Sequence, residues 1–152
     1  MKHAVRIVIL CLVFLAAAIK VNAADPSVNN AQKLFEKYMK LETSFDPQVA
    51  DLFALSAIIQ TTRKFPNGEE RSAKITADQY RALMRVAMPL AKAQGDKNTY
   101  SQISYTPEGD RVLVKCQRQS QLKKSISSVE MIVGPDDKGE WKIFGETTQT
   151  QQ

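Results

Sequence analysis

Four side chains combine a chemically active group with a position on an otherwise apolar face. Tyr38 and Tyr80 fall on the apolar stripes of two predicted helices, so each hydroxyl either completes the rim of the core or lines a cavity. Arg118 and Glu130 continue the two-residue alternation of two predicted strands. A charge on such a face must reach water or meet a partner. The two could form a polar patch inside a cavity, a salt bridge at its mouth, or part of an exposed sheet or dimer surface.

Other catalytic chemistry has little support in the sequence. The one histidine, His3, falls in a segment that we expect to be removed, so the remaining chain would lack histidine for nucleophile activation or metal binding. The adjacent acids Asp136-Asp137 and Glu69-Glu70 stand beside turn residues, which favours solvated loops. We therefore predict no catalytic residue of these kinds, no metal site and no cofactor.

Residues 1–23 have the pattern of a secretory signal peptide. They begin with a short basic segment, continue with an apolar run over 7–19, and end in Val21-Asn22-Ala23, which fits a signal-peptidase site. The apolar run is shorter than the roughly 20 residues that a membrane span needs. We predict a periplasmic or secreted protein with no stable membrane span once the leader is cleaved. An uncleaved leader that tethers the protein is the alternative.

Removing the leader also changes the charge and the cysteine content. The formal net charge of +5 falls to about +2 because three basic residues are lost, so bulk charge gives no argument for nucleic-acid binding. The basic segment 111–124 has no aromatic side chain for base stacking, and no nucleic-acid partner is expected. Cys116 remains, and its alternation with valines predicts a small buried residue. A reactive thiol beside Arg118 is the alternative.

Three helices are predicted in the first part of the remaining chain. Asp25-Pro26 and Asp46-Pro47 each provide an N-cap followed by a first-turn proline, which starts helices over about 26–41 and 47–53. A third helix begins at about residue 77, after a capping-box pattern, and Gly95-Asp96 closes it. Pro89 inside this helix should kink or end it.

The rest of the chain reads as strands joined by short polar turns. Their pattern of β-branched and apolar residues predicts strands over 58–65, 70–75, 100–105, 111–122, 126–133 and 140–150. Consecutive strands with short connections pair antiparallel. We therefore predict the α+β class, with N-terminal helices packed on a curved, mainly antiparallel sheet.

The order of these elements resembles the NTF2-like (cystatin-like cone) superfamily, which includes the ketosteroid-isomerase and SnoaL-like groups. The residues that carry the resemblance are Phe35-Glu36-Lys37-Tyr38, Ser44-Phe45-Asp46, Val49-Ala50-Asp51-Leu52-Phe53 and the closing segment 139–146. The resemblance implies a single domain over 24–148. The glutamine- and threonine-rich composition of 149–152 predicts a polar tail. It also implies a pocket between the helices and the concave sheet, and a homodimer through the open sheet face.

Only some of the catalytic residues of the ketosteroid isomerases have a counterpart in this sequence. The oxyanion-donating tyrosine of the isomerases matches Tyr38. Their catalytic aspartate falls near Gln60 or Thr61, neither of which can act as a carboxylate base. Their buried acid on a late strand falls near Val129, with Glu130 adjacent but on the other face by strand parity. One role of three is retained, which argues against isomerase chemistry.

These observations favour an exported, non-enzymatic domain that binds a small apolar ligand or a protein partner. The residues predicted to line its binding cavity are Tyr38, Phe53, Tyr80, Met84, Arg118 and Glu130. The alternative is a small lyase or isomerase that acts in the same cavity through Tyr38 and an acidic residue such as Glu130. That alternative requires the two side chains to face each other across a real pocket.

Overall fold

The two N-terminal helical segments begin where the aspartate–proline pairs predict. The computed structural model describes residues 25–151, so the leader assigned to residues 1–23 lies outside the described residues. Helix α1 spans Pro26–Thr43, and the Asp25 side chain accepts a hydrogen bond of 2.9 Å from the Ser27 amide. The second segment, η1, is a 3-10 helix over Pro47–Leu52. Phe53 lies outside it and opens the first strand, which corrects the predicted boundary.

Helix α2 spans Ala77–Gln94 and has a complete capping box at its start. The Thr76 amide donates to the Gln79 side chain, and the Gln79 amide donates to the Thr76 hydroxyl. The helix continues past Pro89 and ends at Gly95, whose left-handed φ of +66° suits glycine. The prediction that Pro89 could end the helix is therefore wrong. Pro89 is exposed, so water can satisfy the carbonyl that loses its amide partner.

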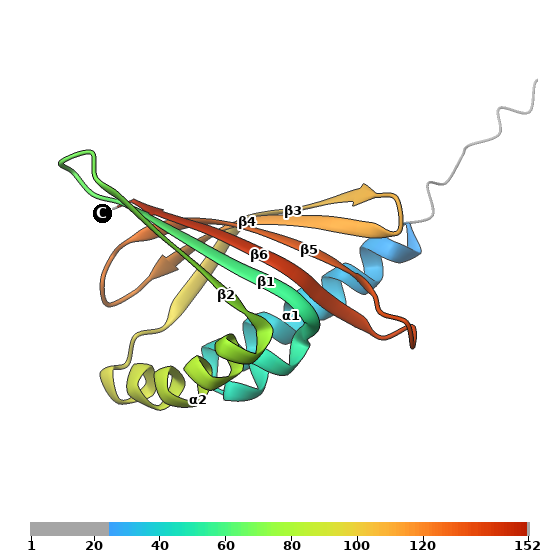
Figure 1. Ribbon diagram of the computed structural model, residues 1–152, viewed down its shortest axis with the longest axis horizontal. Helices are drawn as coiled ribbons and strands as arrows, with labels where there is room; N and C mark the ends of the chain where they lie inside the picture. The colour runs from blue at the N-terminus through green and yellow to red at the C-terminus, as the bar shows by residue number, and fades with distance from the viewer. Residues whose placement is uncertain (1–24, 152) are drawn as a thin grey trace, which may run out of the picture.

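The sheet has six strands in the order β2-β1-β6-β5-β4-β3. All neighbours are antiparallel except β1 and β6, which are parallel. The helices lie together on the concave side of this sheet (Figure 1). The predicted α+β class with a mainly antiparallel sheet is therefore confirmed. The strands are β1 Phe53–Lys64, β2 Glu70–Thr76, β3 Asn98–Glu108, β4 Arg111–Ser120, β5 Ile126–Pro135 and β6 Trp141–Gln151.

Residues 149–151 belong to the sheet and not to a polar tail. Strand β6 lies between β1 and β5, and its last residue Gln151 pairs with Lys64 on one side and Ile126 on the other. The Thr150 hydroxyl also forms a hydrogen bond of 2.7 Å with the Ser127 hydroxyl. The assignment of 149–151 to a tail is therefore wrong, because partners on both sides fix a segment whose glutamine- and threonine-rich composition suggested fraying.

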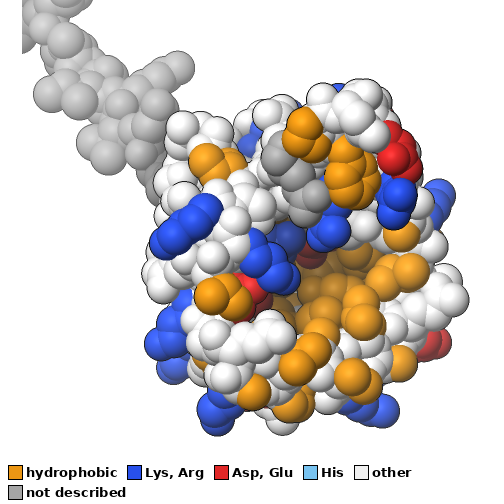
Figure 2. Space-filling model, turned by 90° about the vertical axis from the view of Figure 1, so that its left-hand side faces the viewer, with side chains coloured by type: hydrophobic (Ala, Val, Ile, Leu, Met, Phe, Trp, Pro, Cys, Tyr) orange, Lys and Arg blue, Asp and Glu red, His pale blue; other side chains and the backbone are white. Residues whose placement is uncertain are grey.

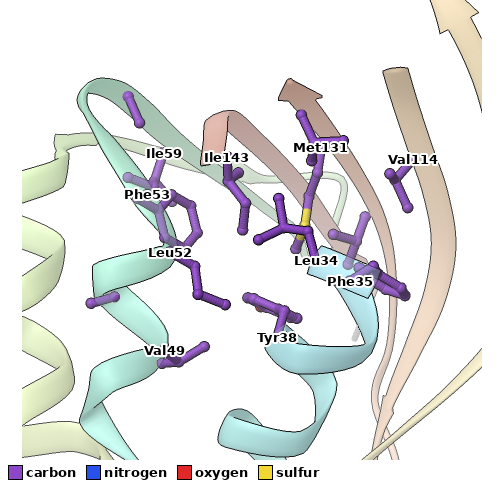
Figure 3. Packing of buried hydrophobic residues seen from close by; sticks show 14 of the residues in the cluster. Leu34, Phe35, Tyr38, Val49, Leu52, Phe53, Ile59, Val114, Met131 and Ile143 are labelled. Atoms are coloured by element: carbon purple, nitrogen blue, oxygen red, sulfur yellow. The ribbon is translucent and has the colours of Figure 1, made fainter. Parts of the chain in front are cut away.

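The core fills the space between α1, η1 and the concave face of the sheet. Figure 3 shows Leu34 of α1 directed toward Met131 on the sheet, whereas Tyr38 extends from the same helix on the side of Leu52 of η1. The Tyr38 ring has no exposed area, and it stacks on Phe35 with ring centroids 5.8 Å apart. Both rings also pack edge-on against the Tyr100 ring of β3, with centroids 5.8 Å and 6.3 Å away, and these contacts hold α1 against the sheet. Between residues 25 and 151, no helix is long and apolar enough to cross a membrane.

Deleting residues 149–152 tests whether this segment is structural. The deletion removes backbone hydrogen bonds from β6 to both β1 and β5. Each of these hydrogen bonds contributes about 1 kcal/mol to the free energy of unfolding. We expect the free energy of unfolding, measured by urea titration, to fall by about 2 kcal/mol or more. Deletion of Gln152 alone is the control and should change little. Equal stability of both variants would show that the segment is a tail after all.

Candidate functional site

An open cavity of about 340 Å³ lies between α2 and the concave face of β1, β4, β5 and β6. Figure 2 shows it as a hollow with hydrophobic side chains on one wall and Lys and Arg side chains near the opposite rim. Its volume is in the range of small-molecule sites. Its position confirms that a pocket forms between the helices and the sheet.

The apolar wall of the cavity comes mainly from one face of α2. Residues three and four positions apart lie on the same side of a helix, so a regular apolar spacing gives a continuous surface. Ile59 of β1 and Phe45, from the turn after α1, extend this surface. The members from α2 are Leu83, Met84, Ala87, Met88 and Ala91.

The floor of the cavity is polar and charged. Arg118 Nη1 donates to the Tyr38 hydroxyl at 3.5 Å and lies 3.9 Å from Glu146 Oε1. Glu146 Oε1 also accepts a hydrogen bond of 3.0 Å from the Thr148 hydroxyl. The Glu146 side chain is 4% exposed, and its second oxygen, Oε2, is buried without a partner. A buried carboxylate oxygen with no donor is unusual in a folded protein.

Burial controls the protonation of this floor. Burial raises the pKa of Glu146, while Arg118 and the hydrogen bond from Thr148 act in the opposite direction. Burial also raises the pKa of Tyr38 well above its ordinary value, and the nearby Glu146 charge adds to this rise. The Tyr38 hydroxyl is therefore a proton donor and not a phenolate at neutral pH.

A second polar group lies beside the first, at the β3 side of the cavity. Glu42 from the end of α1 accepts a hydrogen bond from the Asn98 side-chain amide through Oε1. Its other oxygen, Oε2, and the Tyr100 hydroxyl are buried without hydrogen-bond partners. Tyr100 pairs with Arg118 across β3 and β4. The cavity floor thus holds two carboxylates, one guanidinium and tyrosine hydroxyls.

A β-bulge in β6 explains why the sequence did not reveal Glu146. Strict alternation from the buried Ile143 would direct Glu146 outward. The register against β5 shifts between Ile132, which pairs with Gly145, and Val133, which pairs with Ile143, so that Phe144 is the extra residue. A bulge of this kind redirects the side chains that follow it. Ile143 and Glu146 both point inward although they are three positions apart. No local sequence signal marks this bulge apart from Gly145.

The structure separates the six predicted cavity residues into three groups. Tyr38, Tyr80, Met84 and Arg118 line the cavity, and ligand binding by them stays a prediction. Phe53 is buried in the core against the Tyr80 ring, with centroids 4.8 Å apart, and supports the cavity without lining it.

Glu130 lies on the outer face of the sheet, where it forms an ion pair of 2.8 Å with Lys115. Its neighbours Val129 and Met131 are buried, so strand parity directs Glu130 away from the helices. The prediction that it lines the cavity opposite Tyr38 is therefore wrong. The predicted burial of Cys116 is confirmed, and burial raises the pKa of its thiol to about 11. Over residues 25–151, no cluster of three or more acidic, cysteine or histidine side chains could hold a metal ion.

Several solved structures are similar to this chain. An NTF2-like protein with a cystatin-like fold from Novosphingobium aromaticivorans is 16% identical, with a TM-score of 0.58 over 81% of this chain and 80% of that one. A ketosteroid isomerase-like protein from Erwinia carotovora atroseptica is 9% identical, with a TM-score of 0.54 over 83% and 97%. The S. rosetta CaMKII hub is 16% identical, with a TM-score of 0.60 over 84% and 98%. No protein-family model and no curated protein matches the chain.

These similarities establish the fold. The chain forms the NTF2-like, cystatin-like cone that its order of elements resembles. At such low identities, a shared fold does not carry a shared activity, because this architecture holds different sites in different proteins. Any function must therefore be argued from the cavity itself.

The pH dependence of stability should reveal the buried Glu146 carboxyl. Because its pKa is raised above the ordinary value of 4.5, the folded protein binds this proton more tightly than the unfolded chain does. The protonated Glu146 carboxyl therefore contributes to stability below about pH 4.5, and this contribution is lost as the pH rises through the folded-state pKa. Glu146→Gln cannot ionise. We expect the free energy of unfolding of this variant, relative to wild type, to increase from about pH 4 to about pH 8 in urea titrations.

Glu130→Gln is the matched control, because Glu130 is a carboxylate on the same sheet that is half exposed on the outer face. An increase seen for both variants over the same pH range would not be specific to Glu146. A difference between Glu146→Gln and wild type that stays constant with pH would contradict the assignment of Glu146 as a buried acid with a raised pKa.

Proposed function

We propose that this NTF2-like domain binds a small molecule with an apolar body and a polar end, and that it does so without catalysis. The observation that carries this proposal is the unpartnered, buried Oε2 atom of Glu146 at the floor of an apolar-walled cavity. Buried polar atoms are normally satisfied, so a ligand that supplies a donor would complete the site. The apolar wall of α2 would then cover the rest of the ligand.

The size of the cavity sets the scale of the interaction. A body of six methylene groups, buried against α2, would contribute about 5 kcal/mol at about 0.8 kcal/mol per group. Part of this free energy is lost to the ordering of the ligand, so a micromolar affinity also needs the polar contacts at the floor. The open mouth allows part of the ligand to stay in water.

A small isomerase or lyase is the second candidate, and the same floor is the observation that favours it. Tyr38 is a protonated hydroxyl, and Glu146 is a buried carboxyl on the same side of the sheet with a raised pKa, as acid–base catalysis requires. Glu146 thus replaces Glu130 as the acid. Turnover of a carbonyl compound that Glu146→Gln abolishes and Glu130→Gln preserves would establish this candidate in place of binding alone.

The outer face of the sheet is the candidate surface for a protein partner or a homodimer. Exposed or half-exposed Ile58, Leu113 and Ile132 lie along it beside the Lys115–Glu130 ion pair. One of the similar solved structures is a hub domain, which supports a search for assembly through this fold. Sedimentation equilibrium of the purified protein would test a homodimer directly.

Occupation of the cavity can be tested by filling it. Ala87 lines the cavity from α2, so Ala87→Trp should place an indole where the apolar body of a ligand would lie. We expect the affinity for the neutral apolar dye Nile red to fall by about tenfold or more, equal to about 1.4 kcal/mol. Dye fluorescence measures this change.

Ala82→Trp is the control, because Ala82 is exposed on the same helix and does not line the cavity. It should bind the dye as wild type does. Equal binding by wild type and Ala87→Trp would place the dye elsewhere and would remove the support for a cavity ligand.

We also propose that the protein is exported and cleaved after Ala23. The support is the basic, apolar and small-residue order of residues 1–23. Protein recovered from the periplasmic or culture fraction should begin at Ala24 when its N-terminus is sequenced. Ala23→Arg, which places a large charged side chain at the cleavage position, should leave the leader attached. A wild-type protein that starts at Met1 in the membrane fraction would favour the tethered alternative.

A further inference from the structure

We propose that the cavity floor selects an uncharged head group that donates and accepts hydrogen bonds through neighbouring atoms, of which a carboxamide is the simplest. This inference rests on the proposed binding function and specifies the polar end of the ligand. Its basis is the juxtaposition of Arg118, which can only donate, and Glu146 Oε2, which has no donor.

The first argument is the set of hydrogen-bonding groups that remain free. Arg118 has five N–H donors, and within residues 25–151 its one hydrogen bond is the long contact from Nη1 to the Tyr38 hydroxyl. The 3.9 Å between Nη1 and Glu146 Oε1 is too long for a hydrogen bond. The Arg118 guanidinium therefore has N–H donors without acceptors, and the Glu146 carboxylate has one oxygen without a donor. The two groups lie next to each other on the concave face.

The second argument is the balance of charge. Arg118 and Glu146 carry opposite charges, and Glu42 adds a further carboxylate at the same floor. A carboxylate head group would meet both Glu146 and Glu42. An ammonium group could pair with these carboxylates, but it has no acceptor for the free donors of Arg118. Burying an additional charge without a full partner is costly. The other charged groups of the lining are Arg63 and Lys123, which are exposed, and the more buried Asp96, which forms an ion pair with Lys123.

The third argument is which head group can both accept a hydrogen bond from Arg118 and donate one to Glu146. A carboxamide oxygen can accept from Arg118, while its N–H group donates to Glu146 Oε2. An ester supplies only the acceptor and would leave Glu146 Oε2 unsatisfied, which costs about 1–3 kcal/mol. A carboxamide satisfies both partners and adds no charge. The apolar body attached to it would then extend along Met84 and Ala87 toward the mouth.

Four probes with the same eight-carbon body test the head group. Octanamide, octanoate, octylammonium and methyl octanoate compete at neutral pH with Nile red for the wild-type protein. We expect octanamide to bind at least about tenfold more tightly than each of the other three, equal to about 1.4 kcal/mol. Equal affinities, or tightest binding of octanoate, would overturn the head-group inference and leave the binding function intact. Failure of all four probes and of the dye would overturn the binding function itself.

Variants of the cavity floor test whether Glu146 causes the preference for octanamide over octanoate. Glu146→Gln removes the negative charge and supplies amide donors, so the ratio of octanamide to octanoate affinity should fall by about tenfold. Glu130→Gln on the outer face should leave this ratio unchanged. Thr148→Val removes the hydroxyl that donates to Glu146 and should also lower the ratio, because Glu146 is then held less firmly. An unchanged ratio in a folded Glu146→Gln or Thr148→Val protein would contradict the assignment.

Discussion

The structure depends on how it accommodates a charged pair on the concave face of its sheet. Removing a carboxylate and a guanidinium from water costs several kcal/mol for each ion, and the attraction between Arg118 and Glu146 only offsets this cost when other groups help. Tyr38 and Thr148 supply such help through their hydroxyls. Even so, one carboxylate oxygen has no partner. This unpartnered oxygen distinguishes the cavity floor from the apolar core beside it.

The division of the concave face into a dry part and a polar part follows from the two helices. Helix α1 covers one part of the sheet with Phe35 and Tyr38, and these rings exclude water there. Helix α2 packs Tyr80 against Phe53 of β1, whereas Met84, Ala87 and Met88 line the cavity. Apolar surface that is not covered within the chain is surface that a ligand can cover.

The sequence predicted the elements better than it predicted the site, and the reason lies in particular residues. Caps and prolines are local signals, so the starts of the helices after Asp25 and Asp46 were visible. Arg118 was found because its strand alternates regularly. Glu146 was missed because a bulge at Phe144 breaks the alternation, and a bulge depends on pairing between distant segments. The same non-local pairing gave Gln149 and Gln151 a place in the sheet that their composition did not suggest.

The central position of β6 has a consequence for the order in which the chain can fold. Ile58 pairs with Gly145, so the two halves of the sheet join only when the last strand arrives between them. The hairpins β1–β2 and β3–β4–β5 can form earlier from nearby segments, but each then exposes an unpaired edge, at β1 and β5. The closing strand also brings Glu146 to Arg118. The cavity floor therefore assembles in the same step that pairs the exposed edges of β1 and β5.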